Sequence, residues 1–102
     1  MATLFWPLEI RKTAAFASWL DGLADRRARA KVQARIARLA AGNAGDAGPV
    51  GEGVSELRID HGPGYRVYWK RKGRSVVVLL AGGDKSTQKA DIRLAIRLAR
   101  GL

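Results

Sequence analysis

The residues best suited to chemistry lie in the second half of the chain, within the stretch VSELRIDHGPGYRVYWKRKGRSVVVLLAGGDKS. They are Arg58, Arg66, Tyr68, Lys70 and Lys85. Guanidinium and ammonium groups stabilise the negative charge that builds on phosphoryl oxygens, and a tyrosine ring can stack on a base. With RNA, the nucleophile can be the 2′-hydroxyl of the substrate itself. This set of residues therefore favours binding and cleavage of a ribose-phosphate chain.

We assign each of these residues an expected role. Arg66 is expected to be exposed and to clamp the phosphate, while Arg58 or Lys85 is expected to stabilise the transition state or assist proton transfer. These three residues are the predicted catalytic group. Tyr68 and Lys70 are predicted to bind RNA. Each residue taken alone is compatible with an ordinary exposed position on a strand, but the set is more specific than its members because several should share one face.

Alternating apolar and polar residues predict the strands that carry this set. Three strands are expected, separated by turns at His61–Gly64 and at residues 72–74, and they cover Val54–Asp60, Tyr65–Arg71 and Val76–Ala81. Residues 76–81 are all apolar, which predicts a central strand buried on both faces. The polar face of the first two strands then lies beside a loop at residues 82–86.

The first half of the chain predicts a strand and two helices. Residues 3–11 (TLFWPLEIR) read as an edge strand. Thr13 and Asp25 are each expected to cap a helix. Basic residues cover most of the second helix, so Arg26 and Arg27 are read either as a solvated surface or as RNA-binding residues that contact phosphates. The glycine-rich segment 42–53 is expected to be a loop.

A last helix is predicted over Gln88–Arg100. Ile92, Ala95, Ile96 and Ala99 form its expected core stripe. Leu94 and Leu98 are placed on the outer face, where they are either incidental or a docking patch for a protein partner.

The expected fold is α+β, in the order β-α-α-β-β-β-α. It comprises a small, twisted, mainly antiparallel four-stranded sheet, an α-helical hairpin on one face and a C-terminal helix. The helices are expected to cover one face of the sheet and to leave the other open and basic. Residues 1–102 are expected to form a single domain.

Composition narrows the classes of function. The 102 residues carry a formal charge of +10, from 19 Lys and Arg against 9 Asp and Glu, which favours polyanionic partners. The sequence has no cysteine and a single histidine, His61, so we expect no metal site, no cofactor and no Ser-His-Asp triad. Neither a signal peptide nor a membrane span is expected, and the predicted location is cytoplasmic.

Several segments resemble the RelE/ParE superfamily of type II toxins, and most closely its HigB-like branch of addiction module killer proteins. They are ELRIDHGPGYRVYW, VVVLLAGGDKSTQKADI, the helical segment FASWLDGLADRRARAKVQARIARLAAGNAGD and PVGEGVSELRI. The resemblance covers almost the whole chain, and the segments GYRVYW and GGDKSTQ are specific to the family.

This resemblance implies a RelE-like fold and metal-independent cleavage of mRNA on the ribosome, which inhibits translation. The implied partners are the ribosome, mRNA and a cognate antitoxin that neutralises the toxin, and Leu94 and Leu98 are the expected antitoxin-binding residues. By position, Arg66 corresponds to the phosphate-binding arginine, while Arg58 and Lys85 correspond to the other basic residues of the site.

Two departures from the family pattern keep a ParE-like inhibitor of DNA gyrase as the alternative. Glu56 stands where some ribosome-dependent members carry a lysine. Gln88 and Asp91 occupy the region where members carry a Tyr or His that helps cleavage, and Gln88 is counted among the predicted RNA-binding residues. A third hypothesis is a basic domain that binds RNA or ribosomes without toxicity.

Overall fold

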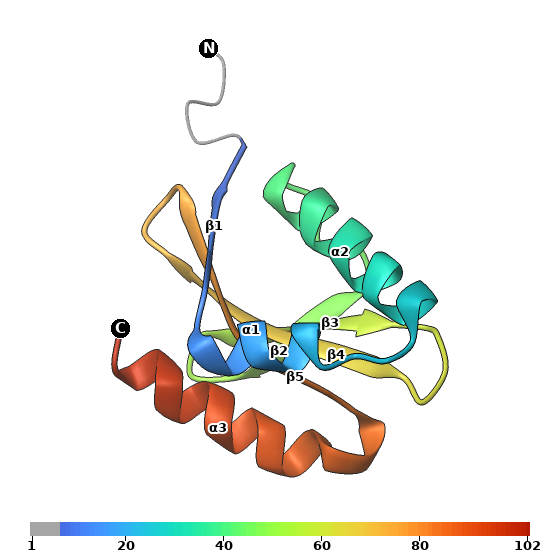
Figure 1. Ribbon diagram of the computed structural model, residues 1–102. Coiled ribbons are helices and arrows are strands. Elements are labelled where there is room, and N and C mark those ends of the chain that lie inside the picture. The colour runs from blue at the N-terminus through green and yellow to red at the C-terminus, as the bar shows by residue number, and fades with distance from the viewer. Residues whose placement is uncertain (1–6) are drawn as a thin grey trace.

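The computed structural model describes residues 7–102, which form a five-stranded sheet and three α-helices (Figure 1). The strands are β1 (Glu9–Lys12), β2 (Ala47–Gly51), β3 (Val54–Ile59), β4 (Tyr65–Lys72) and β5 (Val76–Asp84). The helices are α1 (Ala14–Asp21), α2 (Arg26–Ala40) and α3 (Gln88–Arg100), and a short 3₁₀ turn, η1 (Lys85–Thr87), precedes α3.

The sheet has the order β1-β5-β4-β3-β2. The pairing of β1 with β5 is parallel and all other pairings are antiparallel. The predicted α+β class and the mainly antiparallel sheet are therefore confirmed, but the prediction of four strands is wrong. The additional strand is β2, which lies in the glycine-rich segment that we expected to be a loop.

The sequence of β2, AGPVG, has no clear alternation and only one β-branched residue, Val50, so it does not indicate a strand. It forms because the neighbouring β3 offers its backbone groups, with Ala47 opposite Leu57 and Gly48 opposite Glu56. The first strand also differs from its prediction, since β1 covers only Glu9–Lys12. Residues 3–6 of the predicted strand lie outside the described residues.

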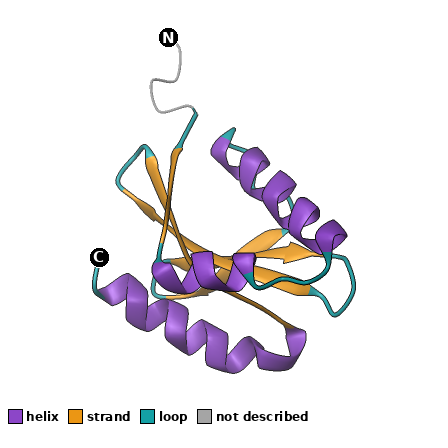
Figure 2. Ribbon diagram, viewed as in Figure 1, coloured by secondary structure: helices purple, strands orange, loops and turns teal. Residues whose placement is uncertain are grey.

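Helices cover both faces of the sheet, which corrects the expectation that one face stays open (Figures 1 and 2). α1 and α2 pack on one face, where Phe16, Leu20 and Val32 join Leu57 and other apolar side chains of the strands. α3 packs on the opposite face against a second apolar cluster. The sheet is therefore the middle of three layers, and α3 covers the face that we expected to be free.

α3 approaches the sheet through two small residues, Ala95 and Ala99, which are both buried. Larger side chains flank this ridge, with Ile92 on one side and Leu98 on the other, and both pack against the second cluster. The placement of Leu94 and Leu98 on the outer face is therefore wrong, since Leu94 packs there too. Alanines in the centre let the helix lie close enough for its flanking leucines to reach the sheet.

Side-chain caps fix the ends of the elements around the site. Thr13 Oγ1 accepts a hydrogen bond from Phe16 N, and Asp25 caps α2, as predicted. The Asp84 carboxylate accepts from Ser86 N at 2.8 Å and so begins η1. The pKa of Asp84 is consequently lowered, first by its side-chain hydrogen bond with Ser86 and then by this backbone bond. This cap fixes the start of the segment that carries Lys85.

β5 continues to Asp84, three residues beyond its predicted end, because two glycines let neighbouring elements lie close. A Cβ on Gly82 would stand 2.1 Å from the ring of Trp19, and one on Gly83 would stand 1.9 Å from Asp91 Oδ2. The two glycines thus leave room for α1 on one face of the sheet and α3 on the other. They belong to the strand β5 and not to the predicted loop.

Candidate active site

The β3–β4 pairing places Arg58 directly opposite Arg66. In this hairpin, Val54, Glu56 and Arg58 face α3, as do Arg66 and Tyr68, so the predicted division of the two faces is confirmed. Like charges directly opposite each other repel across a sheet. The arginine pair therefore requires nearby negative charge, and the structure provides it in Glu56.

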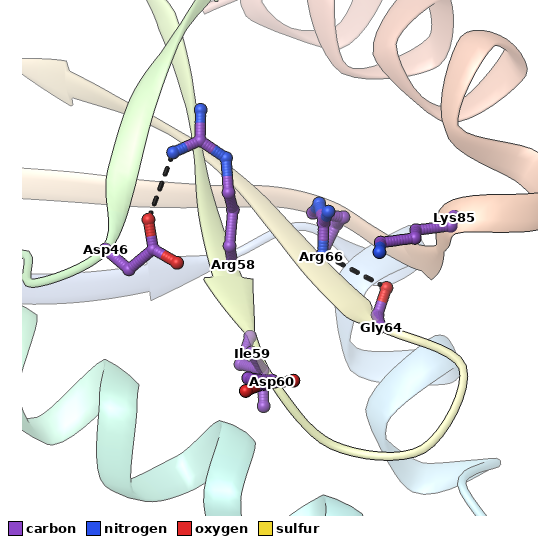
Figure 3. A pocket seen from close by; sticks show the side chains of 7 residues that line it. All are labelled: Asp46, Arg58, Ile59, Asp60, Gly64, Arg66 and Lys85. Atoms are coloured by element: carbon purple, nitrogen blue, oxygen red, sulfur yellow. Dashed lines mark hydrogen bonds and ion pairs between the residues drawn. The ribbon is translucent and has the colours of Figure 1, made fainter.

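A hollow of about 200 Å³ contains the three residues that we predicted to be catalytic (Figure 3). Its walls are Asp46, Arg58, Ile59, Asp60, Gly64, Arg66 and Lys85. Lys85 reaches the hollow from η1, and its methylene chain lies across Gly64, where a Cβ would stand 3.0 Å from Cε. Arg58, Arg66 and Lys85 come from three different elements and are brought together as expected, while their chemical roles remain predictions.

Two carboxylates engage the guanidinium of Arg58. Its Nη1 donates to Asp46 Oδ1 at 3.1 Å and its Nε to Glu56 Oε2 at 2.9 Å. These hydrogen bonds, first that with Asp46, raise the pKa of Arg58 above its usual value. The remaining nitrogen, Nη2, lies over Gly48, where a Cβ would stand only 2.6 Å away. The positive charge of Arg58 is thus largely compensated within the protein.

The side chain of Arg66 is nearly buried, at 10% exposure. Its Nη1 donates to the carbonyl oxygens of Gly64 at 3.2 Å and Tyr65 at 3.1 Å, and its Nε lies 3.7 Å from Glu56 Oε1. Its Nη2 makes no hydrogen bond with any described residue. Our expectation of an exposed Arg66 is therefore wrong. Its hydrogen bonds hold the guanidinium at the wall of the hollow, where Nη2 and the buried Nε have no hydrogen-bond partner among the described residues.

Glu56 connects the two arginines to α3. Its carboxylate is 6% exposed and accepts a hydrogen bond from Gln88 Nε2 at 3.0 Å, in addition to its contacts with Arg58 and Arg66. Gln88 was predicted to bind RNA, but the structure gives its amide this internal partner instead. Glu56 thus fixes both guanidinium groups and the first turn of α3 in one arrangement.

Lys85 is the most accessible cation of the hollow. It is exposed, and its ammonium group makes no hydrogen bond or ion pair within residues 7–102. Together with Nη2 of Arg66 it supplies donors that are not already engaged, whereas Arg58 is occupied. The hollow can therefore hold an anionic oxygen between the rigid Arg66 and the flexible Lys85.

The structure contradicts the prediction that Tyr68 stacks on a base. Its side chain is fully buried beneath α3, and its hydroxyl has no hydrogen-bond partner among the described residues. Burial is the largest cause that raises the pKa of this phenol, followed by the charge of Glu56. Alternation along β4 correctly predicts the face of Tyr68, but it cannot show that a helix covers this face.

The remaining predicted RNA-binding residues lie outside the hollow. Lys70 extends across Gly53, and its Nζ is 3.5 Å from the carbonyl oxygen of Glu52. Arg26 and Arg27 are exposed in the first turn of α2. These positions are compatible with contacts to a long polyanion, but none of the three residues lines the hollow.

Sequence reasoning missed the acidic members of the site, Asp46 and Asp60, and the connecting role of Glu56. Asp46 precedes β2, so its proximity to Arg58 follows from a strand that was not predicted. The signal for Glu56 was available: it lies two residues before Arg58 and therefore shares its face. Within residues 7–102 no cluster of His, Cys, Asp or Glu is arranged to hold a metal ion.

Comparison with known proteins places the chain in a family. Residues 18–100 match the family model described as "Phage derived protein Gp49-like (DUF891)", a span that runs from α1 to the last residue of α3 and includes every residue of the hollow. The chain belongs to the Gp49-like family. This family is associated with toxin–antitoxin systems and is related to RelE-like toxins. The predicted relationship to RelE-like toxins is therefore supported, whereas the HigB-like branch stays a prediction.

One relative matches this chain over nearly its whole length. An uncharacterized protein of Haemophilus influenzae is 53% identical over 95 residues, which cover 93% of this chain and 96% of the relative. Membership of the Gp49-like family also indicates an antitoxin as a partner. No helix in residues 7–102 has the length and apolar character needed to cross a bilayer.

Proposed function

We propose that this Gp49-like protein is the toxin of a type II toxin–antitoxin system and cleaves mRNA on the ribosome without a metal ion, acting in the cytoplasm. The observation that supports the proposal best is the convergence of Arg66 and Lys85 on one hollow, each with a donor that has no partner among the described residues. A phosphodiester is the anion that such a pair fits.

The proposed reaction uses the substrate's own nucleophile. The 2′-oxygen forms a bond to phosphorus while the bond from phosphorus to the 5′-oxygen breaks, which leaves a 2′,3′-cyclic phosphate and a 5′-hydroxyl. Arg66 Nη2 and Lys85 Nζ stabilise the charge on the phosphoryl oxygens, and Lys85 can protonate the leaving 5′-oxygen. Asp60 lines the hollow and has no hydrogen bond with a described residue. We therefore assign it the role of the general base that accepts the proton of the 2′-hydroxyl.

Primer extension on a translated mRNA tests the proposal after brief induction of the toxin in bacterial cells. The wild type is expected to create new 5′ ends within codons. Lys85→Ala is expected to lower the cleavage rate about 10²- to 10³-fold, the usual effect of removing one donor from a developing oxyanion. Arg71→Ala is the matched control, because Arg71 is exposed at the far end of β4. Equal cleavage by all three proteins would contradict the assignment.

A gyrase inhibitor remains the second candidate function, and one structural observation favours it. Glu56 lies between the two arginines and compensates much of their charge, which is unfavourable for a site that must bind a phosphate. The same induced cells distinguish the two functions: accumulated DNA breaks with intact mRNA indicate gyrase poisoning. Normal growth with neither lesion indicates a basic domain that is not a toxin.

A further inference from the structure

A row of four cations leaves the hollow and follows the outer surface of η1 and α3. Lys85, Lys89, Arg93 and Arg97 recur at intervals of four residues, and all four are exposed. Lys85, Lys89 and Arg93 line one shallow depression, and Arg93 and Arg97 line the next. Because Lys85 also lines the candidate active site, the row is continuous with that site.

The row has no internal counter-charge. Lys89, Arg93 and Arg97 make no hydrogen bond or ion pair with a residue in the described part of the chain. The one carboxylate within α3, Asp91, is directed inward to Gly83 and accepts from Thr87 Oγ1. The nearby Glu52 is engaged with Arg100. The positive charge of the row therefore faces solvent without compensation.

Helix stability does not explain this arrangement. Like charges four residues apart repel each other, and the row contains three such pairs. Lys89 also lies in the first turn of α3, and Lys85 lies just before it in η1, where the helix dipole disfavours cations. An external polyanion would relieve both effects, and an uncompensated row of single charges fits the regularly spaced phosphates of a nucleic-acid backbone.

We propose that Lys89, Arg93 and Arg97 form a track for the phosphates of single-stranded RNA that extends the substrate beyond the hollow. Successive cations in α3 are separated by about 6 Å along the helix axis, so the track from Lys89 to Arg97 is about 12 Å long. This inference rests on the proposed RNA substrate, but it concerns binding outside the reacting phosphate and can be tested without cleavage.

The test is the salt dependence of binding to a fluorescein-labelled oligouridine, measured by fluorescence anisotropy. The variant Lys89→Gln/Arg93→Gln removes two charges from the track, and Arg71→Gln/Lys72→Gln removes two from the distant end of β4. Each lost phosphate contact lowers the slope of log K against log salt by about 0.7 for a single strand. The track variant is therefore expected to lose about 1.4 from the slope, and the control is expected to retain the wild-type slope.

This difference in slope has a direct consequence for affinity. Between about 50 and about 200 mM salt, the advantage of the wild type over the track variant should shrink about sevenfold. Equal slopes for the two variants overturn the track, and so does an unchanged RNA slope combined with lost binding of the cognate antitoxin, which would assign the row to that protein. Failure of mRNA cleavage with the expected slopes would reject the proposed function and leave the track in place.

Discussion

Gln88 Nε2 donates a hydrogen bond to Glu56 Oε1 at 3.0 Å, and this contact joins the first residue of α3 to the carboxylate between Arg58 and Arg66. The arginines are thus positioned by the same group that holds the start of the helix covering their face of the sheet. Geometry at the hollow and attachment of α3 are therefore coupled through one side chain.

Glu56→Gln tests this coupling. The amide keeps the shape of the side chain but removes the charge that stabilises two arginines, one of them nearly buried. We expect a loss of about 1–3 kcal/mol in the free energy of unfolding, measured by urea denaturation. Glu52→Gln, which alters the exposed pair with Arg100, is the control and should have much less effect. Equal effects of the two substitutions would show that Glu56 has no special role.

Tyr68→Phe tests the buried hydroxyl. Since this hydroxyl has no hydrogen-bond partner among the described residues, its removal should leave stability unchanged or increase it by about 1 kcal/mol. Burial raises the pKa of Tyr68 from 10.0, so the folded state retains the proton that the unfolded state loses. The wild type should therefore lose stability relative to Tyr68→Phe as the pH rises above 10.0. Parallel stability curves across that pH range would contradict a buried phenol.

Arg66→Ala and Lys85→Ala should separate structure from chemistry. Both should lose cleavage, but Arg66 is nearly buried and its removal leaves Glu56 with fewer partners, so we expect a loss of about 1–3 kcal/mol. Lys85 is exposed, and its truncation should change stability by less than about 0.5 kcal/mol. Thermal denaturation of the purified variants provides the comparison. A fully stable Arg66→Ala would show that its guanidinium does not contribute to packing.

Leu98→Ala tests the position of α3. Because Leu98 packs against the second apolar cluster, its truncation should cost about 1–2 kcal/mol, part of the cost at a fully buried site. Leu102→Ala is the control, since Leu102 is 48% exposed. Chemical denaturation distinguishes the two. A neutral Leu98→Ala would restore the outer-face position that we first expected for this residue.

The sequence predicts the direction of side chains along each strand well, but it predicts poorly which helix packs on which face of the sheet. Alternation in β3 and β4 correctly places Arg58 and Arg66 on one face, because side-chain direction follows from a period of two. The apolar stripe of α3 does not say which face of the sheet receives it, so the burial of Tyr68 was not predicted. The misplacement of Leu98 has a different cause, because the two small alanines at the centre of the stripe let the flanking leucines reach the sheet. β2 was missed because its partner strand, and not its own residues, determines its conformation.

The border formed by β2 has a consequence for association between copies of the chain. Pro49 has no N–H group to offer a further strand, and the register of β2 against β3 shifts between Pro49 and Gly51. An irregular edge that lacks a donor is a poor template for recruiting another strand. This border therefore makes edge-to-edge aggregation of the protein unfavourable.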